Sequence, residues 1–256
     1  TRALSNLGAL FHDASMFFTY YVGCSPHLLR TGAYATSAVG IGMHPNAFMT
    51  APTGDPVAAD LENMEAASQP FDTATLDFLA QWVYENNINP VMVDGQAKFI
   101  VLVSPAQARS LRADQAWIDA QLNVAQKGSD NPIFDGSLGE YNGFVIHKHN
   151  KIWNATRDPD GITANTTTGV LTFAPVANVT LDETKIQGAI VMGAHGIALA
   201  QGGGVYQNRR KEDDYGNIKG YALGHIFGAK RADWENEARD GVWSNQSSAV
   251  VYTFQG

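Results

Sequence analysis

Cysteine and charge are both scarce in this chain. Cys24 is the single cysteine among 256 residues, and charged residues make up only 16%. One cysteine excludes an internal disulfide and a zinc site built from several cysteines. Soluble domains typically carry about 25% charged residues. A charge-poor surface is typical of a protein that is covered by partners, because interface cores are depleted in charged residues.

Long hydrophobic runs and basic stretches are also scarce. The longest apolar run, residues 189–200, is broken by two glycines and a histidine and is too short to span a bilayer. The net charge is −8, and the one dense basic cluster, residues 209–211, is followed directly by three acidic residues. Binding to nucleic acid needs a basic surface for the phosphates. The sequence therefore predicts neither a membrane protein nor a dedicated DNA-binding protein.

No catalytic motif stands out either. His147 and His149 are two residues apart on a predicted strand, so their side chains share a face. A zinc enzyme needs a third protein ligand, and no spacing assigns that role to Asp158 or Asp160. A solvated strand face is the favoured interpretation, and a metal-dependent hydrolase is the enzyme alternative. We expect no enzyme activity, no metal and no cofactor.

Three helices have clear sequence signals. Apolar residues recur at helical spacing from Leu4 to Tyr21. Asp72 is a predicted N-cap for a second helix. Ser104 and Gln107 form a predicted capping box for a third helix, with Pro105 as its first residue. This helix is renewed after residue 114 and runs to about 125.

A fourth helix is predicted from small residues. They fill residues 186–200 and indicate a closely packed helix that would end at the glycines 202–204.

The remaining segments favour strands and turns. Lys98–Val103 is an apolar run of strand length, and Phe144–His149 is a second predicted strand. Residues 127–143 indicate a turn-rich loop, and 154–178 a hairpin or loop excursion. Further strands are expected near residues 221–227 and 249–254. Strands and helices alternate here without a regular βαβ rhythm, which favours an α+β fold.

Two sets of residues are the structural candidates. Residues 31–70 lack any period, and a loop of that length in a compact domain indicates an extended arm that orders against a neighbour. Its apolar residues Met43, Phe48 and Met49 are the candidate contacts. The second set favours sharp chain reversals. It comprises Asn131, Pro132, Gly136, Gly139 and Gly143.

Residues 94–243 resemble the major capsid protein family of N4-like podophages. The resemblance rests on an ordered series of motifs rather than on any one of them. The motifs lie at Pro105–Arg112, Trp117, Asn131–Gly136, Leu138–Gly143, Val145–His149, Met192–Ala200, Glu212–Gly216 and Gly224–Lys230. The first seventy residues show no clear match.

The resemblance implies a Hong Kong 97-type capsid fold. Residues 1–70 would hold a possible spine helix and the extended arm, 71–205 an axial domain, and 206–256 strands that return to a peripheral domain. The protein would form hexamers and pentamers of an icosahedral shell that encloses double-stranded DNA without sequence-specific binding. It would have no membrane partner. Scaffolding, decoration and portal proteins would be its partners.

Several alternatives stay open at this point. The chain could be another virion component, such as a decoration or tail-tube protein, or an encapsulin-like compartment protein.

Assembly of the capsid protein would take place in the host bacterial cytoplasm, and the mature location would be the virion. The chain starts with Thr1 and not with Met, so it is either processed or part of a longer product.

Overall fold

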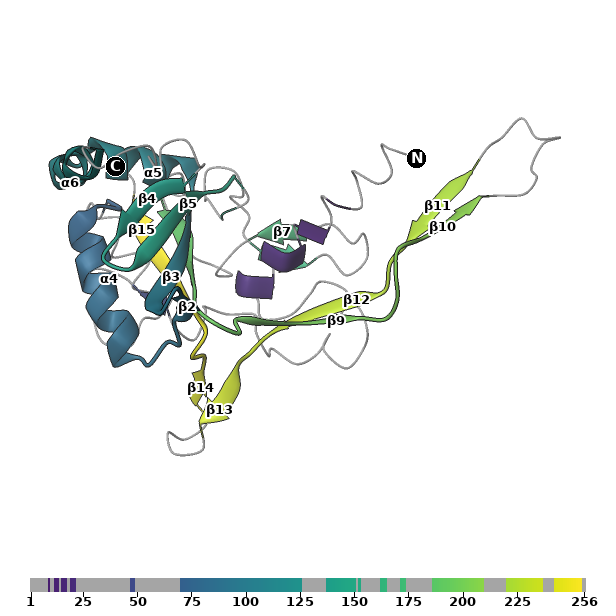
Figure 1. Ribbon diagram of the computed structural model, residues 1–256. Coiled ribbons are helices and arrows are strands. Elements are labelled where there is room, and N and C mark those ends of the chain that lie inside the picture. The colour runs from purple at the N-terminus through teal and green to yellow at the C-terminus, as the bar shows by residue number, and fades with distance from the viewer. Residues whose placement is uncertain are drawn as a thin grey trace.

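The computed structural model shows a mixed β-sheet with three helices packed on one face and a long hairpin that leaves the sheet (Figure 1). The structure describes residues 9, 12–13, 15–17, 19–21, 47–48, 70–125, 137–150, 152, 162–164, 171–173, 186–209, 220–236 and 242–254. None of the described helices is long and apolar enough to cross a membrane.

Seven strands form the main sheet. They are β1 (Ala47–Phe48), β2 (Val91–Val93), β3 (Gln96–Val103), β4 (Ser137–Tyr141), β5 (Phe144–Lys148), β8 (Ile186–Met192) and β15 (Ser248–Phe254). Their order is β1-β15-β8-β3-β5-β4, with β2 paired to β3. β3 and β5 are parallel, as are β1 and β15, whereas the other pairs are antiparallel. The sheet therefore joins strands from all three expected segments of the chain.

The predicted capping signals start the predicted helices. Asp72 precedes α4 (Thr73–Glu85), and its side chain accepts a hydrogen bond from the Thr75 amide at 2.8 Å. Ser104 and Gln107 form both bonds of a capping box at the start of α5 (Pro105–Ala113). Helix α6 (Gln115–Ala125) follows after a one-residue break. Every described residue between 9 and 21 is also helical, as the spacing predicts.

One face of the sheet forms the core with α4, α5 and α6. Side chains alternate along a strand, so every second residue of β3 and β5 points toward these helices. The core includes Phe71, Leu76, Leu79, Val83, Phe99, Val101, Val103, Leu111, Trp117, Phe144, Ile146, Val191 and Val251, each at most 3% exposed. Burying each large apolar side chain stabilises the fold by about 1.5–3 kcal/mol before entropy is counted.

The prediction of a helix over residues 186–200 is wrong. This segment forms β8, which lies between β15 and β3, and then β9 (Ile197–Gln201). Three β-branched residues, Ile186, Ile190 and Val191, fit a pleated surface well, and ladder bonds to two partner strands outweigh the local helix preference. The glycines 202–204 consequently follow a strand and do not end a helix.

Two other segments refine the sequence prediction. The expected loop 127–143 contains β4, which pairs with β5 through a bulge. The segment 154–178 contains the antiparallel strands β6 (Ile162–Ala164) and β7 (Leu171–Phe173), so it is a hairpin. Strands expected near 221–227 and 249–254 are present.

A two-stranded extension, the hairpin arm, leaves the sheet between β8 and β15. It consists of β9 paired with β12 (Phe227–Arg231), and of β10 (Tyr206–Arg209) paired with β11 (Tyr221–Gly224). A short hairpin of β13 (Trp234–Asn236) and β14 (Val242–Ser244) then returns the chain to β15. In Figure 1 the far strands β10 and β11 lie at the opposite end of the molecule from α4.

Candidate assembly surfaces

The hairpin arm exposes large apolar side chains. Half of the large hydrophobic residues that are exposed in the described part of the chain lie on it. They are Leu199, Val205, Tyr206, Tyr221 and Ile226, each at least 50% exposed. Groups of exposed apolar residues of this kind mark binding surfaces.

The apolar residues lie on both faces of the β10–β11 ribbon. Tyr206 is paired with Gly224 on one face of the ribbon. Arg209 is paired with Tyr221 on the other face. The ring of Tyr206 lies over Gly224 so closely that a Cβ there would be 2.2 Å from its Cζ. On the other face the Arg209 guanidinium lies 5.9 Å from the centre of the Tyr221 ring. The ribbon thus presents an aromatic ring on each side.

The N-terminal helix lies along the arm and also contacts the sheet. The His12 ring is 4.7 Å from the Phe227 ring and 5.7 Å from the His225 ring, measured between centroids. At the other end of the helix, the Tyr21 hydroxyl donates a hydrogen bond to the Gly188 carbonyl at 2.7 Å. The helix therefore connects the arm to β8.

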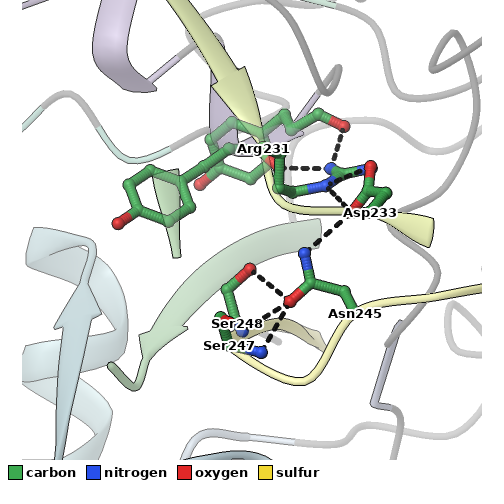
Figure 2. Close-up of polar contacts among 7 residues, drawn as sticks. Arg231, Asp233, Asn245, Ser247 and Ser248 are labelled. Carbon is green, nitrogen blue, oxygen red and sulfur yellow. Dashed lines mark hydrogen bonds and ion pairs between the residues drawn. The ribbon is translucent and has the colours of Figure 1, made fainter. Parts of the chain in front are cut away.

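A buried polar cluster, the anchor cluster, holds the base of the arm (Figure 2). It comprises Arg231, Asp233, Asn245, Ser247 and Ser248. Arg231 is only 3% exposed and forms a two-pronged contact with Asp233, with Nε and Nη2 each 2.8 Å from a carboxylate oxygen. Its Nη1 also donates to the Tyr20 carbonyl at 2.6 Å, at the end of the N-terminal helix.

The same cluster reaches the start of β15. The Asn245 side chain donates to Asp233 at 2.7 Å, and its oxygen accepts from the Ser247 and Ser248 amides at 2.8 Å each. A buried ion pair is stable only when such hydrogen bonds compensate for the lost water. The cluster joins three parts of the fold, namely the N-terminal helix, the arm and the sheet.

Sequence analysis did not identify the anchor cluster. Its contacts join residues up to 211 positions apart, as in the bond from Arg231 to the Tyr20 carbonyl. The one local signal is the Asn-x-Ser-Ser pattern at 245–248, because asparagine often accepts bonds from amides two or three residues later.

Two of the glycine candidates lie in turns or bulges. Gly143 has a φ of 81° and Asn142 a φ of 47°, and together they join β4 to β5. Two positive φ values are what a tight hairpin turn requires. Gly139 has a φ of 137° at the bulge of β4. Asn131, Pro132 and Gly136 lie outside the described residues.

The candidates of the extended segment are only partly described. Phe48 lies in β1, whose backbone pairs in parallel with β15 opposite Val251. Met43 and Met49 lie outside the described residues. The segment 31–70 thus contributes at least one short strand to the main sheet.

The two histidines do not form part of a metal-binding group in the described structure. His147 is half-buried on β5, and His149 follows the strand with its ring stacked 4.5 Å from Phe17. The described residues contain no group of three or more His, Cys, Asp or Glu side chains that could hold a metal ion.

Comparison with known proteins identifies one family and several similar structures. A family model for "Phage capsid protein" matches residues 34–253. The capsid of Ralstonia phage GP4 is 19% identical over 87% of this chain and 56% of that chain, with a TM-score of 0.52. The capsid of cyanophage Pam1 is 18% identical over 82% and 54%, with a TM-score of 0.57. No curated protein sequence matches.

A third similar structure is the capsid of Helicobacter pylori bacteriophage KHP30. It is 16% identical over 77% of this chain and 65% of that chain, with a TM-score of 0.54. The chain thus spans between about half and two thirds of the length of these solved chains. At such identities the likeness shows the fold, and it confirms the α+β, Hong Kong 97-type capsid fold that the sequence predicts.

Proposed function

Since this chain belongs to the phage capsid protein family, we propose that it is the major capsid protein of a tailed phage and tiles with copies of itself. Its units would be hexamers and pentamers of an icosahedral shell around double-stranded DNA. The structural observation that supports self-assembly is the hairpin arm, which carries exposed aromatic rings on both faces. An apolar ribbon with two open faces gains stability when neighbours cover it.

The anchor cluster supports the same role. An arm that binds a neighbour must keep a defined direction, because a small change of angle at its base moves its far end by much more. Arg231 fixes that base by bonding to Asp233 and to the N-terminal helix inside the protein. Repeated copies can then meet at similar angles, which a closed shell requires.

The fold suggests how the chain divides between the regions of a capsid subunit. The main sheet with α4–α6 would be the axial domain, near the centre of each hexamer or pentamer. The N-terminal helix would be part of the spine helix, and it would form the peripheral domain with the hairpin arm. This division differs from the sequence-based one for β15, which lies in the main sheet and would belong to the axial domain, whereas the sequence assigned all of 206–256 to the peripheral domain.

The finer features of the proposal follow from the sequence. The motif order over residues 94–243 favours the N4-like podophage type. A net charge of −8 suits a wall that encloses DNA without adhering to it. The protein would act without catalysis, with scaffolding, decoration and portal proteins as partners, and would assemble in the cytoplasm of a bacterial host.

Sedimentation and electron microscopy of the expressed full-length protein test the proposal. We expect megadalton particles or capsomers with five-fold and six-fold symmetry. A population consisting only of tubes would indicate a tail-tube protein, and a stable monomer would indicate a decoration protein. Either result would overturn the assignment as the major capsid protein.

A further inference from the structure

A second group of exposed apolar side chains lies where α4 approaches the β2–β3 hairpin, with the Tyr84 ring 5.9 Å from the Phe99 ring of β3. We call it the α4–β2 edge and define it by Tyr84, Glu85, Met92, Val93 and Asp94. Tyr84, Met92 and Val93 are 60%, 64% and 43% exposed. Both acidic residues are exposed as well.

Strand β2 also has a side on which no described strand pairs with it. Among the described strands it pairs only with β3. A peripheral strand with open backbone groups is a template for a strand from another chain. The α4–β2 edge therefore offers both apolar side chains and backbone partners.

The α4–β2 edge is acidic. Residues 81–95 contain Glu85 and Asp94 and no lysine or arginine. The nearest cation in sequence, Lys98, lies opposite Val91 and forms an ion pair with Glu140 at 2.8 Å. Lys98 thus already has a carboxylate partner.

The hairpin arm has the opposite charge. Its described parts, 197–209 and 220–231, contain no aspartate or glutamate. Arg209 and Lys230 are exposed, whereas Arg231 is buried against Asp233. The ten intervening residues contain three basic and three acidic side chains, so they add no net charge to the arm.

The two surfaces cannot meet within one molecule. In Figure 1 α4 lies at one end and β10 and β11 at the other, with the sheet and the base of the arm between them. Contact between them must therefore join two copies head to tail. A contact between two different surfaces of the same chain repeats from copy to copy, and it closes into a ring when the rotation permits.

We propose that the hairpin arm of one copy docks on the α4–β2 edge of a neighbouring copy. One aromatic ring of the arm would lie beside Tyr84 and Met92 on one face of β2, and the other beside Val93 on the opposite face. Arg209 would face Glu85 and Asp94. The proposal rests on the proposed capsid function, because it names the partner surface for the arm. Charge complementarity sets the direction of the contact and disfavours arm-to-arm pairing, in which cations would meet.

A charge exchange tests the contact. Arg209→Glu and the pair Glu85→Lys with Asp94→Lys should each weaken subunit association by about tenfold at low salt, because like charges would face one another. The variant that combines all three changes should recover most of the particle yield. Asp119→Lys, an exposed change on α6, is the matched control and should leave the yield unchanged.

Disulfide trapping tests the contact directly. In a Cys24→Ser background, Val93→Cys and Tyr221→Cys together should give covalent multimers when assembled particles are oxidised. Neither single cysteine should give a ladder beyond dimers. Circular dichroism of the unassembled subunits serves to select variants that keep the fold.

The outcomes separate the two proposals. Suppose that the parent protein forms particles, but the combined charge exchange does not restore the particle yield and the paired cysteines give no covalent multimers. The docking is then overturned and the capsid function stands. Equal loss of yield in the Asp119→Lys control would also overturn it. If the parent protein forms no particles, the capsid function fails first, and the docking fails with it.

Discussion

At the scale of single residues, Gly193 shows how closely three backbones meet at the end of β8. Its amide donates to the Ser247 carbonyl at 2.8 Å, and the next amide, of Ala194, donates to the Asn89 carbonyl at 2.9 Å. A Cβ at position 193 would lie 2.1 Å from the Asn89 oxygen. A backbone atom cannot move aside as a flexible side chain can, so this position requires glycine.

Gly193→Ala should therefore lower the free energy of unfolding by about 3 kcal/mol, the upper part of the range for overpacking. Urea denaturation of unassembled subunits measures this change. Gly228→Ala is the control, because no atom lies within 4 Å of its Cβ position. Equal losses for the two variants would contradict the explanation.

The stability that Asp114 contributes to the fold should depend on pH. Burial alone would raise its pKa, but hydrogen bonds from the Thr73 hydroxyl, the Thr73 amide and the Ala116 amide outweigh burial and lower the pKa below its usual value. A lowered pKa in the folded state stabilises the protein above the unfolded pKa of about 3.9. That stability is lost as the pH falls through the folded value.

Asp114→Asn should cost about 1 kcal/mol at pH 7, because an amide NH2 group would replace the carboxylate oxygen that accepts hydrogen bonds from Thr73. The difference from the parent protein should shrink as the pH falls below about 4, because the unfolded aspartate takes up its proton there and the folded one does so at a lower pH. Thermal unfolding at pH 7 and pH 3 checks both statements. A difference that stays constant with pH would show that the charge of Asp114 is not involved.

At the scale of elements, the direction of the hairpin arm depends on the anchor cluster. The arm strands β9 and β12 pair with each other and lie outside the main sheet. Arg231 connects them to the N-terminal helix, and Asp233 connects them through Asn245 to β15. A guanidinium can make these contacts at once because its donors are fixed in a planar fork, whereas an ammonium cannot.

Arg231→Lys should keep the buried charge and still loosen the arm. We expect amide hydrogen exchange in β9 and β12 to become about 30-fold faster, which corresponds to about 2 kcal/mol of local stability. Exchange in β3 and α4 should stay unchanged. Lys230→Arg, at the exposed neighbouring position, is the control, and faster exchange in that variant too would rule out a specific role for Arg231.

At the scale of the whole molecule, the described structure combines a well-packed sheet with an arm that has little to pack against. The core residues of α4, β3 and β5 are buried, whereas five large apolar residues of the arm are at least half exposed. A protein with this distribution can fold as a subunit and still gain much of its apolar burial on assembly. Folding and assembly should therefore be separable by mutation.

Replacing Tyr206, Tyr221 and Ile226 by serine should lower subunit stability by no more than about 1.5 kcal/mol, because each substitution at an exposed position changes it by about 0.5 kcal/mol. The same variant should lose particle formation. Phe78→Ser on α4, a residue 61% exposed, is the matched control for the removal of an exposed ring. Normal particles from the triple variant would show that the arm does not drive assembly.

The sequence alone determined the features that depend on neighbours a few residues apart. Asp72 and the Ser104–Gln107 capping box begin their helices because a cap bonds to amides within the next turn. The apolar run of β3 and the Asn142–Gly143 turn are local in the same way. The order of motifs also led to the capsid fold, which the family match supports.

Only the tertiary structure decided the features that depend on distant partners. Residues 186–200 became strands because β15 and β3 flank β8, which small residues alone do not reveal. Arg231 became an anchor because the fold brings the Tyr20 carbonyl to it and the Asn245 side chain to its neighbour Asp233. Five large apolar residues of the arm became a surface because no described element covers them. In each case the outcome depends on long-range pairing and burial, which local sequence does not encode.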